Sequence, residues 1–168
     1  GDVYKRQVIN PTEDDLVEIV LESYDRFKKL LNEEPKIALL SYSTLDDIKD
    51  ENVIKLQNVV RRVKEVNNKI NIDGQLQLDA AIIEDVAKIK APNSSVAGKA
   101  NVLIFPNLES GNIAYKIAER FGNMTALGPI TQGMDKPVND LSRGCSVNDI
   151  IGVIAITCIQ SMLSLIHI

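Results

Sequence analysis

Strand-like and helix-like segments alternate along this chain, and this alternation most constrains its fold. Apolar runs at residues 36–41 and 101–105 are typical of strands buried on both faces, and residues 125–130 are a further strand candidate. Stretches with helical periodicity lie between and beyond these runs. Such a pattern predicts an α/β protein of three α/β/α layers, with a mainly parallel sheet covered by helices on both faces.

The helical stretches have recognisable starts and inward faces. A helix start is predicted at Thr12, with an inward stripe of Leu16, Val20, Phe27 and Leu31. We predict further helices over residues 53–67, 78–89 and 108–121, and one that begins at Ser146. We expect residues 150–165 to form a buried helix, and Asp73 and Gly74 to form a turn. The helix over residues 108–121 should point three apolar side chains inward: Ile113, Ile117 and Phe121.

Composition excludes several classes of function. The net charge of −4 argues against a nucleic-acid binder. No apolar run reaches the ~18 residues of a membrane span, and no signal peptide is evident, so we expect a cytoplasmic protein without a membrane partner. Cys145 and Cys158 fit no metal-ligand spacing, and a reducing compartment is the default for them.

The segment that precedes the last helix is the richest in chemical groups. Ser142 offers a hydroxyl, Arg143 a fork of donors suited to phosphate, and Gly144 a backbone that a ligand can approach. A solvated turn with an exposed arginine explains the same residues. Asp149 can be a general base with a pKa raised by burial, or the third residue of a capping box begun by Ser146. The residues alone leave both alternatives open.

Other polar groups follow predicted strands or open predicted helices. Ligands of parallel sheets bind at the carboxyl ends of the strands, where we expect residues 41–44, 106–112 and 132–143. Asn139 is a turn or cap residue by type, whereas Tyr115 and Lys116 can face a cleft or lie on the surface.

Four ordered blocks of the sequence closely resemble phosphate acetyltransferases. These are residues 73–81, 91–106, 111–116 and 128–149, which read DGQLQLDAA, APNSSVAGKANVLIFP, GNIAYK and GPITQGMDKPVNDLSRGCSVND. The resemblance covers about residues 11–160 and implies the carboxyl-terminal half of a two-domain protein with an isocitrate/isopropylmalate dehydrogenase-like fold. It implies a second α/β domain at 8–130 and a return segment at 131–162 that completes the mostly absent first domain. Residues 1–7 and 163–168 are expected to be non-native ends.

The resemblance also implies a reaction, in which an acetyl group moves between acetyl phosphate and coenzyme A. Coenzyme A is a substrate, and no metal or other cofactor is implied. By motif position Ser142, Arg143 and Asp149 are the catalytic residues. Substrate-binding residues are expected among the same serine and arginine, Asn139, Tyr115, Lys116 and Asn112.

The resemblance also implies two properties of the chain and of the whole protein. The chain alone should have little activity because one wall of the cleft is absent, and the whole protein should be a homodimer. A regulatory acyl-CoA-sensing domain, as in some malic enzymes, and a phosphate butyryltransferase are the competing interpretations.

Overall fold

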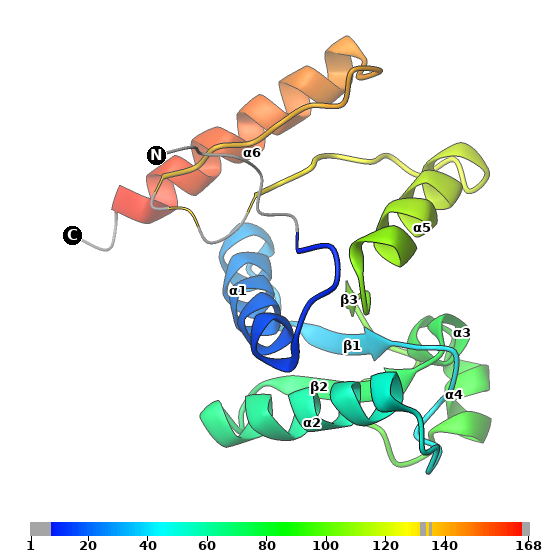
Figure 1. The fold of residues 1–168 in the computed structure, drawn as a ribbon. Coiled ribbons are helices and arrows are strands. Elements are labelled where there is room, and N and C mark those ends of the chain that lie inside the picture. Colours follow the sequence, from blue (N-terminus) through cyan, green and yellow to red (C-terminus); the bar gives the residue numbers. More distant parts are fainter. Residues whose placement is uncertain (1–7, 132–133, 135, 166–168) are drawn as a thin grey trace.

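The computed structural model describes residues 8–131, 134 and 136–165, and its centre is a three-stranded parallel sheet (Figure 1). The strand order is β2-β1-β3, with β1 at Lys36–Leu40, β2 at Asn71–Leu76 and β3 at Val102–Ile104. The helices are α1 (Glu13–Leu31), α2 (Glu51–Val66), α3 (Leu78–Ile82), α4 (Glu84–Lys90), α5 (Leu108–Arg120) and α6 (Val147–Leu165). The expected leader at residues 1–7 lies outside the described residues, as do residues 166–168 of the expected tail.

The central strand β1 divides the interior into two cores. Its side chains alternate between the two faces of the sheet, as the pleat requires. Ile37 and Leu39 pack with the apolar faces of α1 and α2, whereas Ala38 and Leu40 pack with a second cluster that includes Ala81 of α3 and Ala87 of α4. Helices therefore cover both faces, and the predicted three-layer α/β arrangement is confirmed.

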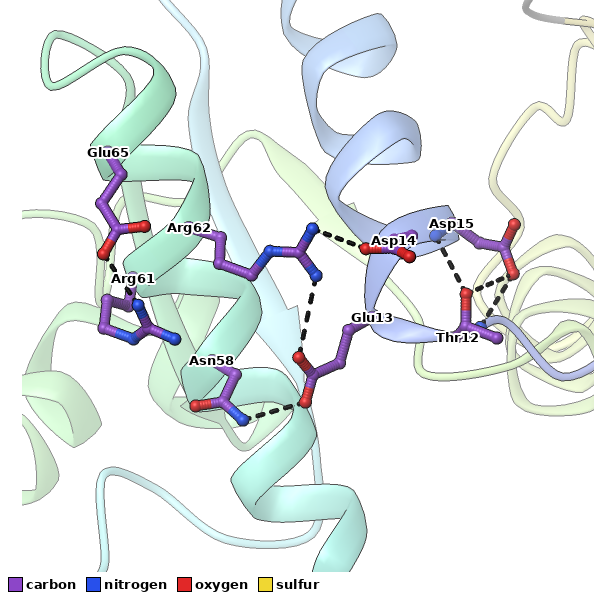
Figure 2. A network of polar contacts seen from close by, with 8 residues as sticks. All are labelled: Thr12, Glu13, Asp14, Asp15, Asn58, Arg61, Arg62 and Glu65. Atoms are coloured by element: carbon purple, nitrogen blue, oxygen red, sulfur yellow. Dashed lines mark hydrogen bonds and ion pairs between the residues drawn. The ribbon is translucent and has the colours of Figure 1, made fainter.

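Polar contacts fix how α1 begins and how it lies against α2 (Figure 2). Thr12 Oγ1 accepts a hydrogen bond from the Asp15 N–H, and Asp15 Oδ2 accepts one from the Thr12 N–H. These two bonds form a capping box at the predicted helix start. Arg62 of α2 pairs with Asp14, and Asn58 Nδ2 donates to Glu13 Oε1 at 2.9 Å. These contacts orient α1 across the same sheet face as α2.

Three local predictions are wrong. The predicted turn at Asp73 and Gly74 lies inside β2, where Gly74 passes so close to Leu39 that a Cβ there would lie 2.7 Å from the Leu39 Cβ. The segment 78–89 forms two helices, which meet at Ile83. Residues 125–130 form no strand in the described structure, because they lie beside no strand with which to pair.

Apolar faces that we predicted to be buried are exposed. Ile113, Ile117 and Phe121 on α5 are 59%, 53% and 89% exposed, and Leu31 at the end of α1 is 58% exposed. On α6, the described side chains that are buried are Val153 and Gln160, so this helix is not buried as predicted. It lies along the outer side of α1, away from the sheet (Figure 1). These faces are exposed because nothing in the described part of the chain covers them.

Within the described residues, no helix is both long and apolar enough to cross a membrane.

Candidate functional site

The entry to α6 positions Asp149. Asp149 Oδ2 accepts a hydrogen bond of 2.7 Å from the Ser146 N–H, and the Asp149 N–H donates to Ser146 Oγ at 3.2 Å. This reciprocal pair is a capping box with Asp in place of Glu, so the capping role of Asp149 is present. The carboxylate is also held at a defined place beside the turn that precedes the helix.

Of the two alternatives for Asp149, a pKa raised by burial does not agree with the structure, in which the pKa of this carboxyl is lowered. Hydrogen bonds from the Ser146 N–H and the Ser146 hydroxyl lower the pKa of this carboxyl, and the charge of Arg120 lowers it further. Partial burial of the side chain raises the pKa, but by less than the two hydrogen bonds lower it, and Arg120 has the smallest effect. The carboxylate is therefore charged at neutral pH, which is the state that a proton acceptor needs.

Ser142 and Arg143 lie on a tight turn directly before the α6 cap. The Cys145 N–H donates to the Ser142 carbonyl at 3.1 Å, which closes a β-turn, and the Gly144 N–H donates to Ser142 Oγ at 3.3 Å. Both side chains are exposed, and in the described part of the chain Arg143 makes no ion pair. A guanidinium and a hydroxyl thus face solvent a few residues ahead of the fixed carboxylate.

Asn139 makes contacts that differ from the substrate-binding role expected of it. Its Nδ2 donates to Thr157 Oγ1 at 2.8 Å and to Gln160 Oε1 at 2.7 Å, both on α6. Its Oδ1 accepts from the Thr131 N–H at 3.0 Å. Both amide hydrogens are used within the protein, so this side chain ties the loop to the helix.

The expected ligands on α5 lie on its exposed surface. Asn112, Tyr115 and Lys116 are all exposed, and Lys116 Nζ lies 5.0 Å from the centroid of the Tyr115 ring. No contact in the described structure joins them to Ser142, Arg143 or Asp149. Arg120, in the last turn of α5, acts electrostatically on Asp149, and nothing in the sequence pattern indicated this residue.

A separate cleft of about 580 Å³ opens at the carboxyl ends of β1 and β3. This is where strand order changes direction in the sheet, as expected of ligand crevices in parallel sheets. Two of the three loops predicted at this edge line it. The lining residues are Asn10, Leu40, Ser41, Tyr42, Asn52, Lys55, Leu56, Leu78, Phe105, Pro106, Asn107 and Ser110. The expected catalytic residues do not line this cleft.

No group of three or more His, Cys, Asp and Glu side chains is placed to hold a metal ion in the described residues. Cys145 and Cys158 are free thiols.

Comparisons with known proteins agree on one family. The phosphate acetyl/butaryl transferase family matches residues 5–158. A phosphate acetyltransferase of Clostridium acetobutylicum is 53% identical over 152 residues, which cover 90% of this chain and 46% of that protein. The Bacillus subtilis phosphate acetyltransferase is 46% identical, with coverage of 92% and 47%. The chain thus spans about half the length of the curated relatives that it matches.

Solved structures give the same result. A phosphotransacetylase from Streptococcus pyogenes superposes with a TM-score of 0.85 at 46% identity, covering 92% of this chain and 47% of that one. A branched-chain phosphotransacylase from Enterococcus faecalis gives a TM-score of 0.77 at 26% identity, with coverage of 93% and 56%. From the family match and these relatives, the chain belongs to the phosphate acetyl/butaryl transferase family.

Proposed function

We propose that this chain is the part of a phosphate acetyltransferase that carries its catalytic segment. The whole protein would move an acetyl group between acetyl phosphate and coenzyme A. The observation that supports this most strongly is the identity of about half of all residues, over nine-tenths of the chain, with proteins named phosphate acetyltransferase. The chain contributes a charged carboxylate, a hydroxyl and a guanidinium within eight residues.

The chemistry assigns one role to each of these groups. Asp149 accepts the proton of the coenzyme A thiol as sulfur attacks the acetyl carbonyl carbon of acetyl phosphate. The carbonyl oxygen becomes an oxyanion, to which the Ser142 hydroxyl donates a hydrogen bond. The bond between the acetyl carbon and the phosphate oxygen then breaks, the thioester forms, and Arg143 neutralises the departing phosphate. This sequence uses coenzyme A as a substrate and no metal.

The arrangement of the chain supports a division into two parts. We propose that residues 8–130 belong to one α/β domain and that residues 131–162 complete another, most of which is not in this chain. The exposed apolar side chains of α5 and α6 support this division, because several large apolar side chains on one helix face are normally covered by another part of a protein. The isolated chain would then be inactive. A homodimer and a cytoplasmic location of the whole protein stay predictions.

A chimera tests the proposed function directly. Residues 8–162 of this chain replace the matching segment of the Clostridium acetobutylicum relative. Formation of acetyl-CoA from acetyl phosphate and of butyryl-CoA from butyryl phosphate is then measured with coenzyme A as the acceptor. We expect turnover with a preference for the acetyl substrate, because the relatives named for acetyl transfer are the more similar ones. A folded chimera that turns over neither substrate contradicts the proposal, and a preference for butyryl phosphate assigns the longer acyl group.

A further inference from the structure

The loop that carries Ser142 and Arg143 is attached to α6 at two separate places. One attachment is the capping box of Ser146 and Asp149 at the start of the helix. The other is Asn139, whose amide hydrogens reach Thr157 and Gln160 in the second half of the helix. Figure 1 shows the loop running alongside α6 between these two places.

The second attachment involves a buried side chain of α6, Gln160. Gln160 is 2% exposed, and its Nε2 has no partner in the described structure, so the hydrogen bond from Asn139 to its Oε1 offsets part of the cost of its burial. Thr157 Oγ1 donates to the Val153 carbonyl at 2.7 Å and therefore presents a lone pair to Asn139. Thr131 holds the Asn139 oxygen from the other side.

The distance between the two attachments is not much shorter than the greatest length that the loop can span. Along the helix, Ser146 and Thr157 are separated by about 17 Å, at 1.5 Å per residue. The seven steps from Asn139 to Ser146 include the tight turn at Ser142, whose ends lie within about 7 Å, so the loop reaches no further than about 21 Å. Anchoring at both ends therefore limits how far Arg143 can move relative to Asp149.

We propose that Asn139 is a positioning residue, which acts through Thr157 and Gln160 of α6 to hold Ser142 and Arg143 at a fixed place beside Asp149. This inference rests on the proposed function. Reaction steps of this kind are sensitive to placement, and a misplacement of about 1 Å can cost about 10²-fold in rate. The proposal replaces the expectation that Asn139 binds substrate.

The test compares a change at Asn139 with changes at Thr157, its partner on α6. In the chimera, Thr157→Val removes the oxygen that accepts from Asn139 with little change of shape, whereas Thr157→Ser keeps it. Thr125→Val, the same change at an exposed site, is the matched control. We expect Asn139→Ala and Thr157→Val each to lower kcat by about tenfold or more with little change of KM. Thr157→Ser should restore most of the rate, and the effects of the pair should not add.

Other outcomes overturn the proposal. A raised KM in Asn139→Ala together with a silent Thr157→Val makes Asn139 a substrate ligand. A lower melting temperature with unchanged kcat in both variants makes the contacts merely structural. An inactive unmodified chimera counts against the proposed function. The positioning role is then tested by a second measurement, the rate at which the Cys145 thiol is chemically modified.

That second measurement needs no turnover. Cys145 is partly buried in the turn of the same loop, so its rate of modification by a disulfide reagent reports how firmly the loop is held. In the 168-residue chain with Cys158→Ser, we expect Asn139→Ala and Thr157→Val to speed modification several-fold, and Thr125→Val to leave it unchanged. Equal rates in all four proteins overturn the proposal.

Discussion

Replacing Asp149 by asparagine separates its role in the helix cap from its proposed role as a general base, because only the general base requires a charge. An asparagine Oδ1 can still accept the hydrogen bond that Asp149 Oδ2 accepts from the Ser146 N–H at 2.7 Å. The hydrogen bonds of the capping box are therefore kept, but the side chain can no longer accept a proton from the thiol. We expect the Asp149→Asn chimera to fold as the unmodified chimera does.

The effect on rate should be large. General-base catalysis by a positioned side chain contributes about 10²–10⁴-fold, so we expect kcat for acetyl-CoA formation to fall by at least about 10²-fold. Binding of coenzyme A, measured by calorimetry, should change little, because the cap that shapes the turn remains.

Ser146→Ala provides the complementary control. It removes the hydroxyl that accepts from the Asp149 N–H at 3.2 Å, which should cost about 1 kcal/mol of unfolding free energy, yet it keeps the carboxylate. We expect lower stability and a far smaller loss of rate than in Asp149→Asn. If Asp149→Asn turns over at the rate of the unmodified chimera while its coenzyme A affinity is also unchanged, the base assignment is refuted.

Three further predictions concern stability and titration. Gly74→Ala should destabilise the chain by about 1–3 kcal/mol in urea unfolding, because the new Cβ would lie 2.7 Å from the Leu39 Cβ; an unchanged midpoint would mean that β2 does not pass β1 so closely. Thr12→Ala should lower the free energy of unfolding by about 0.5–2 kcal/mol through loss of the α1 cap, seen as a lower thermal midpoint. An unchanged midpoint would mean that this cap does not stabilise the chain. Because the pKa of Asp149 in the folded protein is lowered from 3.8, this carboxylate stabilises the fold above that value, and the stabilisation is lost as the pH falls through the folded pKa. Arg120→Ala should raise this pKa, measured by NMR titration. An unchanged pKa would mean that Arg120 does not act on Asp149.

Features governed by neighbouring residues were predictable from the sequence. The capping boxes at Thr12 and Ser146 need only residues three positions apart, and both are present. The buried strand β1 and the amphipathic α2 follow from apolar periodicity, since each is covered within this chain. The three-layer fold follows from the order of these elements.

Features governed by distant or absent neighbours were not predictable. The turn signal at Asp73 and Gly74 is overridden by pairing with β1, where only a glycine fits beside Leu39. The stripe of Ile113, Ile117 and Phe121 does indicate a helix, but it cannot tell whether a partner surface is present.

The candidate site divides in the same way. Its motif locates Ser142, Arg143 and Asp149 on one short stretch, and the capping alternative for Asp149 was recognisable there. The role of Asn139 depends on partners 18 and 21 residues away, and the influence of Arg120 on Asp149 depends on how α5 ends near the start of α6. No local pattern contains such information.

The most direct measurement is a crystal structure of the chimera with coenzyme A and an unreactive analogue of acetyl phosphate. We predict that the Asp149 carboxylate lies within about 3 Å of the sulfur, the Ser142 hydroxyl within the same distance of the acetyl oxygen, and the Arg143 guanidinium against the phosphate. A complex in which both ligands are bound and these three side chains point away from them would contradict the proposed mechanism.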